Sequence, residues 1–162
     1  QVIVNHNYID LLQGKYKGKK ETLSNTTLDP IKLSSTLNSL YQRNIEFVIL
    51  EASSHGLKQN RLNGLVFDIG IFTNLSHDHL DYHKSVKDYL NSKLYLFKEL
   101  IKKNGNVISD ARIKELKRIK KICNKKKLNL NLIFDKKKGI EVILHKFKDE
   151  KQIIKIKFKK KI

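Results

Sequence analysis

Two continuous apolar runs are the feature that most constrains how this chain can fold. Phe47–Leu50 and Val66–Phe72 are short, largely apolar stretches without the strict alternation that marks a strand with one solvated face. Runs of this kind indicate strands buried on both faces, as in parallel sheets covered by helices on either side. These two segments therefore predict an α/β protein.

Helices and strands alternate along most of the chain, after an irregular start at residues 1–28. A helix is expected from Asp29 to about Gln42, because Asp is a favoured N-cap and Pro30 suits the first helical position. A second helix is predicted from about Ser85 to Lys102, followed by a turn at Asn104-Gly105 and a strand at Asn106–Ser109. A third helix is then predicted at Ala111–Cys123, a strand at Leu130–Phe134 and a hairpin within Gly139–Lys161. This order predicts a mainly parallel sheet flanked by helices, with an antiparallel C-terminal hairpin. In the first helix, the predicted apolar stripe is Ile31, Leu37, Leu40 and Tyr41.

The charge of the chain is strongly uneven along its length. The formal net charge is +18, but residues 1–100 carry 12 basic and 10 acidic residues, and residues 101–162 carry 22 and 6. Thirty of the 34 basic residues are lysines, whereas proteins that recognise nucleic acids usually add arginine for its planar fork. We therefore attribute the excess to compositional drift, and nucleic acid is not expected to be the main partner.

The length and composition fit one cytoplasmic domain. The chain has 162 residues, and no apolar run approaches the ~20 residues that a membrane span needs. It does not begin with a charged and then apolar signal segment. The single cysteine, Cys123, cannot form an internal disulfide. We expect a protein of the reducing cytoplasm without a membrane partner.

Polar residues follow both apolar runs, which places them where open α/β sheets bind ligands. Glu51 comes directly after the first run and could bind Mg²⁺, cap the next helix or form a structural ion pair. The second run is followed by Thr73–His83, which contains a dense group of potential metal ligands. They are His77, Asp78, His79, Asp81 and His83. Spacing does not choose among the three histidines, and we expect His77 and His83 to cap the loop and bond its backbone.

Lys93 falls on the apolar face of the predicted helix from Ser85 to Lys102. That face consists of Val86, Tyr89, Leu90, Leu94, Phe97 and Ile101. Lys93 could extend its ammonium group outward from the rim of this face. Alternatively it is buried with a lowered pKa, and a neutral amine can add carbon dioxide to become a carbamate, an oxygen ligand for magnesium.

The combined motifs resemble the central domain of the Mur ligases, and among them the tripeptide synthetases. The resemblance rests on Glu51-Ala52-Ser53-Ser54-His55-Gly56-Leu57 with Gln59 and Arg61, on Asp78-His79-Leu80-Asp81, on Tyr89 with Lys93, and on Asn25-Thr26-Thr27. It implies that Glu51, His79 and a carboxylated Lys93 hold Mg²⁺. It also implies that UDP-N-acetylmuramoyl-L-alanyl-D-glutamate is contacted by Asn25, Thr26, Thr27, Ser53, Gln59 and Arg61. Without the resemblance, Thr26 and Thr27 could equally form a turn before the helix at Asp29.

The resemblance also implies an activity in peptidoglycan precursor synthesis. ATP would phosphorylate the D-glutamyl carboxylate, and the amine of meso-diaminopimelate or L-lysine would displace the phosphate. The family's Gly-rich phosphate loop ending in Gly-Lys-Thr/Ser is missing from the sequence, because Gly14-Lys15 and Gly18-Lys19 lack its spacing and hydroxyl. We therefore expect residues 1–162 to be a partial central domain, an excerpt of a larger monomeric ligase or a truncated gene product. It would lack the uridine-binding and amino-acid-binding domains and be unable to turn over ATP alone.

Three other functions fit parts of the sequence. A folylpolyglutamate synthase shares the ATP chemistry but should lack the combination of Asn25-Thr26-Thr27 with Ser53–Arg61. A metal-dependent phosphohydrolase could use His77–His83, although such enzymes usually gather ligands from several separated helices. A basic RNA-binding module could use residues 101–162, and its steeply salt-dependent binding would survive Glu51→Ala and Lys93→Ala.

Overall fold

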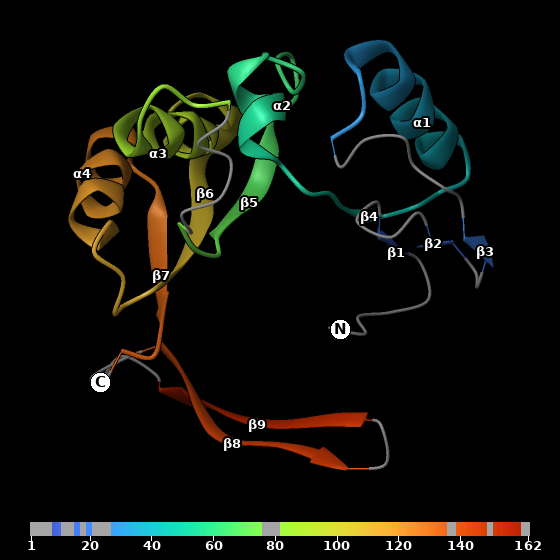
Figure 1. Ribbon diagram of the computed structural model, residues 1–162. Coiled ribbons are helices and arrows are strands. Elements are labelled where there is room, and N and C mark those ends of the chain that lie inside the picture. The colour runs from blue at the N-terminus through green and yellow to red at the C-terminus, as the bar shows by residue number, and fades with distance from the viewer. Residues whose placement is uncertain are drawn as a thin grey trace. The chain divides into compact units, whose positions relative to one another are not determined.

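The structure is a computed structural model that describes most of the chain. Backbone is described for residues 8–10, 15–16, 19–20, 27–75, 82–135, 139–148 and 151–159, and side chains for 27–75 and 82–135. The chain divides into two compact units, Gln1–Leu65 with Asp81–Lys93, and Val66–Leu80 with Leu94–Ile162. Each unit is described by itself below (Figure 1).

Among its described residues, the first unit contains a small mixed sheet, two complete helices and most of a third helix. The strands β1 (Tyr8–Asp10), β2 (Lys15–Tyr16), β3 (Lys19–Lys20) and β4 (Phe47–Ile49) lie in the order β3-β2-β1-β4. β1 and β4 are parallel, and the other two pairings are antiparallel. The sequence predicted one sheet, but β4 and β5 belong to separate sheets. The complete helices are α1 (Pro30–Gln42) and the short α2 (Ser54–Lys58), and the third, α3 (Val86–Tyr95), runs on into the second unit.

The predicted start and end of α1 are confirmed, whereas its predicted apolar stripe is partly wrong. Asp29 Oδ1 accepts hydrogen bonds from the backbone N–H groups of Ile31 and Lys32, as expected of an N-cap. The buried residues are Leu33 and Leu40, seven positions apart. Ile31 and Tyr41 are exposed, at 84% and 76%, because neither lies on the helix face that these two leucines define.

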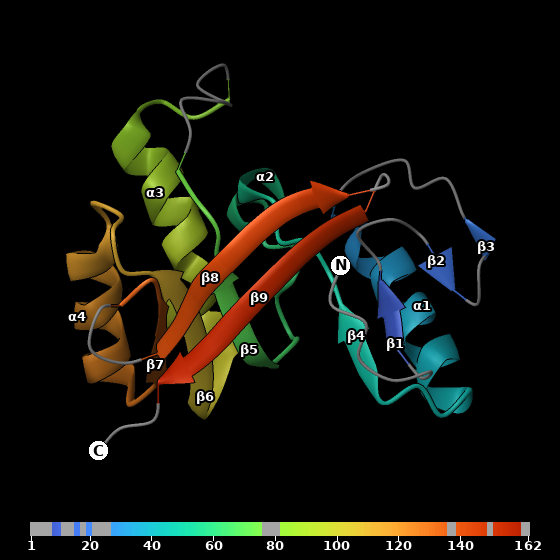
Figure 2. The same cartoon turned by 90° about the horizontal axis from the view of Figure 1, so that it is seen from below.

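The second unit confirms a mainly parallel sheet with an antiparallel hairpin. Its strands, in the spatial order β5-β6-β7-β8-β9, are β5 (Phe67–Phe72), β6 (Ile101–Asp110), β7 (Asn129–Ile133), β8 (Gly139–Lys148) and β9 (Lys151–Lys159). The first four are parallel to their neighbours, and β8 and β9 form the hairpin (Figure 2). The predicted turn at Asn104-Gly105 lies within β6, where Asn104 has φ 60° and the register with β5 shifts.

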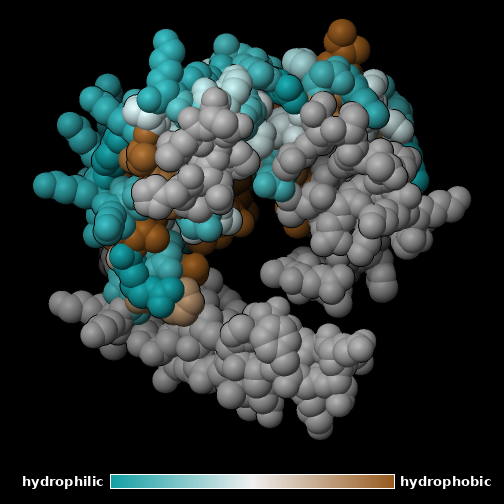
Figure 3. Space-filling model, viewed as in Figure 1, coloured by the Kyte–Doolittle hydropathy of each residue, from teal (hydrophilic) through white to brown (hydrophobic). Residues whose placement is uncertain are grey.

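Three helical segments complete the layers, and their limits differ from prediction. α3 (Val86–Tyr95) continues into a π-helix, η1 (Leu96–Leu100), and β6 then begins at Ile101, so the predicted helix runs two residues too far at its C-terminal end. α4 (Leu116–Lys126) begins after a turn region rather than at Ala111. Its lysines and arginine face solvent, and Figure 3 shows hydrophilic side chains over this helix.

Helices pack against the second sheet through a dense apolar layer. Leu94, Phe97, Val107 and Ile119 are at most 1% exposed. Gly70 of β5 allows this close approach, because a Cβ there would lie 2.8 Å from side-chain atoms of both Phe97 and Ile101. The core of the second unit therefore forms between the central strands of its sheet, η1 and α4.

The prediction that both apolar runs are buried on two faces is wrong for the described residues. In β4, Phe47 and Ile49 are exposed at 55% and 45%. In β5, Ile69 and Ile71 are exposed while Phe72 is buried. Alternate side chains of a strand point to opposite faces, so only one face of β5 is covered by the described part of the chain.

Candidate ligand and metal site

Glu51 lies two residues after the last residue of β4, beyond the carboxyl end of the strand, as predicted. Its side chain is exposed, and its backbone carbonyl accepts a hydrogen bond from Thr27 Oγ1 at 2.9 Å. The N-cap of α2 is Ser53, whose hydroxyl accepts a bond from the Gly56 N–H at 3.1 Å. Glu51 is therefore not the helix cap, and its carboxylate enters no ion pair among the residues described.

Thr27 connects the segment before α1 to the segment after β4. Its side chain is buried, and its hydroxyl accepts a hydrogen bond from the Ser53 N–H at 2.9 Å. The same oxygen lies 2.9 Å from Ser53 Oγ. Gly56 lets α2 approach it, because a Cβ there would lie only 2.7 Å from Thr27 Cβ. Thr27 is thus enclosed by protein atoms on the α2 side.

Arg61 and Gln59 extend this network along the chain that follows α2. Arg61 Nη1 donates to the Thr27 carbonyl, and Arg61 Nε donates to Gln59 Oε1, both at 2.8 Å. Gln59 Nε2 in turn donates to the Tyr82 hydroxyl at 3.2 Å. Four of the residues predicted to bind substrate, Thr27, Ser53, Gln59 and Arg61, are therefore joined in one hydrogen-bonded network.

Lys93 lies on α3, and the predicted apolar face beside it is buried at Tyr89, Leu90, Leu94 and Phe97 but not at Val86, which is 42% exposed, while Ile101 belongs to β6. The side chain of Lys93 is half-buried, with Nζ 5.2 Å from the centre of the Tyr89 ring, which is 2% exposed. The sequence left two alternatives open for Lys93, a side chain that extends into solvent and a buried one. The structure shows neither extreme, because the side chain is half-buried. The ammonium group is directed over an aromatic face that attracts cations.

The remaining predicted site residues fall outside the described part of the chain. These are Asn25, Thr26 and His79, and the same holds for His77, Asp78 and Asp81. No group of three or more His, Cys, Asp or Glu residues able to hold a metal occurs among the described residues. Of the described candidates, the Glu51 carboxylate suits Mg²⁺, whereas Lys93 suits it only as a carbamate because an ammonium group repels a cation.

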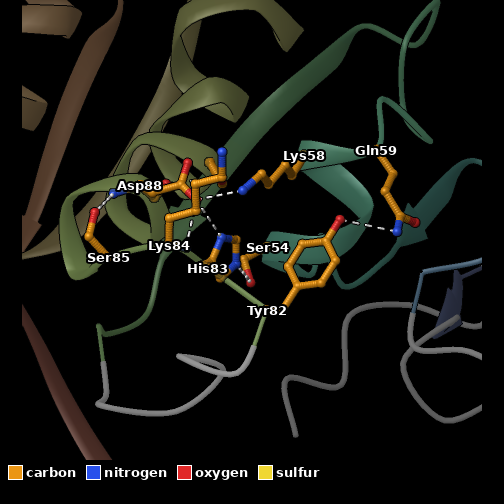
Figure 4. Close-up of polar contacts among 9 residues, drawn as sticks. Ser54, Lys58, Gln59, Tyr82, His83, Lys84, Ser85 and Asp88 are labelled. Atoms are coloured by element: carbon orange, nitrogen blue, oxygen red, sulfur yellow. Dashed lines mark hydrogen bonds and ion pairs between the residues drawn. The ribbon is translucent and has the colours of Figure 1, made fainter.

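A buried polar cluster around His83 was not predicted from the sequence (Figure 4). His83 Nε2 lies 2.9 Å from Ser54 Oγ, and the side chain of His83 is 0% exposed. His83 was expected to bond the loop backbone, but its partner is this hydroxyl. Asp88 Oδ2 accepts hydrogen bonds from Lys58 Nζ and from the Lys84 N–H. In the sequence, only the double serine Ser53-Ser54 indicated a second polar contact here. Ser53 caps α2, and the Ser54 hydroxyl is the partner of His83.

Charges and burial shift the ionisation of this cluster. Burial lowers the pKa of His83 from its ordinary 6.5, and the neighbouring Lys58 lowers it further, while Asp88 opposes the shift. The pKa of Asp88 is lowered, mainly by the hydrogen bond from Lys58. At neutral pH the cluster therefore contains a neutral imidazole beside an ionised carboxylate paired with an ammonium group.

The fold and the site together define an α/β protein in which a hydrogen-bonded polar network follows strand β4 along the chain. Comparison with known families agrees: the Mur ligase middle domain model matches residues 4–162, and the chain belongs to this family. No helix among the described residues is long and apolar enough to cross a bilayer.

Similar proteins carry one activity in their names. The chain is 44% identical over 94 residues to a UDP-N-acetylmuramoyl-L-alanyl-D-glutamate–2,6-diaminopimelate ligase of Parabacteroides distasonis, which covers 58% of this chain and 18% of the relative. A ligase of the same name from Wigglesworthia glossinidia brevipalpis is 48% identical over 82 residues, 51% of this chain and 16% of the relative. This chain thus matches less than a fifth of the length of each.

A solved structure with the same ligase name has a similar fold. It superposes with a TM-score of 0.69 at 25% identity, covering 85% of this chain and 29% of that one. The structural match covers more of this chain than the sequence matches do, and it supports the assignment of the chain to the α/β class.

Proposed function

We propose that this chain forms part of the active site of an ATP-dependent ligase of peptidoglycan precursor synthesis, working in the cytoplasm. The ligase would join 2,6-diaminopimelate to UDP-N-acetylmuramoyl-L-alanyl-D-glutamate. The observation that carries the proposal is the network of Thr27, Ser53, Gln59 and Arg61, which is contiguous and lies beside Glu51. The names of the relatives support the choice of diaminopimelate over lysine.

In this proposal Arg61 is the principal contact to the anionic precursor. A guanidinium group has five N–H donors, and the network engages Nε and one donor of Nη1 within the described residues. The remaining donors can bind a carboxylate or diphosphate oxygen while the network holds the side chain in place. Gln59 is exposed and fixed at both ends of its amide, so it can present the precursor with a defined edge.

The reaction needs charge neutralisation more than a protein nucleophile. ATP transfers its γ-phosphoryl group to the D-glutamyl carboxylate, giving ADP and an acyl phosphate. The amine of diaminopimelate then forms the C–N bond as phosphate leaves, and the surplus proton of the amine passes to solvent. Magnesium, when bound, would neutralise charge between the two anions that are brought together.

Glu51 and Lys93, with His79, are the residues proposed to hold this magnesium. The Glu51 carboxylate is exposed and can face a ligand. Lys93 would contribute after its neutral amine attacks carbon dioxide, forming an N–C bond and releasing one proton to solvent. The product is an anionic carbamate, whose oxygens are ligands of the kind that magnesium prefers.

Nuclear magnetic resonance titration with UDP-N-acetylmuramoyl-L-alanyl-D-glutamate tests the substrate assignment. We expect backbone shifts at Gln59 and Arg61, and weaker shifts with the L-alanyl-L-glutamate epimer. Arg61→Lys, which removes the planar fork, should weaken binding by about tenfold or more, whereas Arg43→Lys at the end of α1 should not. Equal binding by the Arg61 and Arg43 variants would contradict the assignment.

Carbon-13 bicarbonate tests the proposed role of Lys93. A carbamate carbon signal should appear in the parent chain, strengthen with Mg²⁺ and disappear in Lys93→Arg. Lys87→Arg, an exposed position on the same helix, is the matched control and should keep the signal. A signal that persists in Lys93→Arg would exclude Lys93 as the carboxylated residue. We also expect no ATP turnover by the 162-residue chain alone, since the sequence contains no phosphate-binding loop.

A further inference from the structure

His83 is a fully buried polar side chain to which the proposed chemistry gives no role. Its Nε2 pairs with Ser54 Oγ, but Nδ1 is buried and has no hydrogen-bond partner within the described residues. Asp88 Oδ2 lies 3.6 Å from Nδ1, which is longer than a hydrogen bond. Buried polar atoms in native proteins are nearly always paired, so a group held in this state calls for an explanation.

The surrounding charges select one tautomer of His83. The neutral ring has one N–H donor and one acceptor nitrogen. The Asp88 carboxylate favours the proton on Nδ1, which faces it, so that Nε2 accepts from the Ser54 hydroxyl. Lys58 and His55 are the other titratable groups whose charges affect the His83 ring. The ammonium group of Lys58 forms an ion pair with Asp88.

This order of serine, histidine and aspartate also occurs in hydrolases, but a nucleophilic role does not fit here. Ser54 is 3% exposed and His83 is 3% exposed, so an acyl substrate cannot reach the hydroxyl. Ser54 is instead the first residue of α2, next to the cap residue Ser53. The hydrogen bond therefore attaches the beginning of α2 to the segment that leads into α3.

The same ring also supports the aromatic surface beneath Lys93. His83 stacks on Tyr89 with ring centres 5.0 Å apart and an angle of 26° between the ring planes. The ammonium group of Lys93 lies over that Tyr89 ring. A continuous series of contacts thus runs from Ser54 through His83 and Tyr89 to Lys93, within the first unit of the structure.

We propose that His83 is a positioning residue that fixes the substrate-contacting segment Ser53–Arg61 relative to Lys93. The inference rests on the proposed function, because it assigns Arg61 to the precursor and Lys93 to the metal. Two further contacts run in parallel with it, the ion pair of Lys58 with Asp88 and the hydrogen bond of Gln59 with Tyr82. His83 differs from these because it is buried and contacts both sides through one rigid ring.

Paired substitutions of His83 test the proposal in the full 162-residue chain. His83→Gln places an amide where Nε2 lies and can keep the Ser54 bond, whereas His83→Asn is too short to reach it. Ser54→Ala removes the same bond from the other side, with Ser39→Ala, an exposed serine of α1, as its control. Two readouts are compared: the affinity for UDP-N-acetylmuramoyl-L-alanyl-D-glutamate, and the Lys93 side-chain resonances, which the Tyr89 ring current displaces.

His83→Asn and Ser54→Ala are expected to lower the affinity by about tenfold and to move the Lys93 resonances. His83→Gln should stay within about twofold of the parent. A folded His83→Asn chain with parental affinity and parental Lys93 resonances would overturn the proposal. Should that variant not fold, the same two readouts on Ser54→Ala decide the question. If the parent itself does not bind the precursor, the proposed function fails, and the Lys93 resonances alone still test the coupling.

Discussion

Replacing Gly56 by alanine tests how tightly α2 is packed against Thr27. A Cβ at position 56 would lie 2.7 Å from Thr27 Cβ and Cγ2, against the 3.4 Å at which ordinary contact begins, so Thr27 must retreat by about 0.7 Å. Its hydroxyl makes contacts of 2.9 Å to Glu51 O, Ser53 N and Ser53 Oγ, and a retreat of that size breaks at least one of them.

The expected loss of stability can be worked out from three opposing effects. Overpacking costs about 1–3 kcal/mol, and a lost hydrogen bond costs about 1 kcal/mol. Alanine recovers up to about 1 kcal/mol of helix propensity. The net loss in the free energy of unfolding is therefore about 2 kcal/mol, equivalent to a fall in melting temperature of about 4–8 °C for a chain of this length.

Urea unfolding followed by circular dichroism measures this loss, and amide hydrogen exchange in α2 shows whether it is local. Ser39→Ala controls for helix propensity at an exposed site and should be neutral or slightly stabilising. Thr27→Ser removes the Cγ2 contact, so combining it with Gly56→Ala should cost less than the sum of the two single changes. A Gly56→Ala chain as stable as the parent, or strictly additive effects, would refute the packing argument.

Two further predictions concern the second unit, with Ile31 of the first unit as a control position. Leu94→Ala, at a fully buried position, should cost about 2–5 kcal/mol in urea unfolding, while Ile31→Ala, at an 84% exposed position, should change stability by less than about 0.5 kcal/mol. Arg112 holds the pKa of Asp110 below its ordinary 3.8 by hydrogen bonding the ionised carboxylate. That stabilisation is present above about pH 3.8 and is lost as the pH falls through the lowered folded pKa. Arg112→Gln should therefore raise the Asp110 pKa in a carboxyl-carbon titration and shift acid unfolding to higher pH.

Local signals in the sequence predicted those parts of the fold that depend on neighbouring residues. The cap and first turn at Asp29-Pro30 set the start of α1, because both effects operate within four residues. The alternation after Gly139 predicted the hairpin for the same reason. Burial was harder to predict, as Ile31 and Phe47 show, because it depends on what packs against a helix or strand from elsewhere in the chain.

The candidate site shows the same division between local and distant effects. The string from Glu51 to Arg61 placed Ser53, Gln59 and Arg61 close together because it is short. The bond of His83 to Ser54 joins residues 29 positions apart, and no periodicity in the sequence specifies it. The π-helix after α3 was also not predicted, since it differs from an α-helix only in its hydrogen-bond spacing.

The residues of the network differ in whether they can contact a ligand or only hold other residues in place. Thr27 is 3% exposed and its one hydroxyl proton is shared between two acceptors, so it has little capacity left for a substrate. Arg61 is half-buried and retains N–H donors beyond those engaged in the network. Thr27→Val should therefore destabilise the fold and weaken precursor binding together, because a methyl group cannot replace the buried hydrogen bonds. Arg61→Lys should weaken binding with little change in the urea midpoint, and the opposite pattern would assign the ligand contact to Thr27.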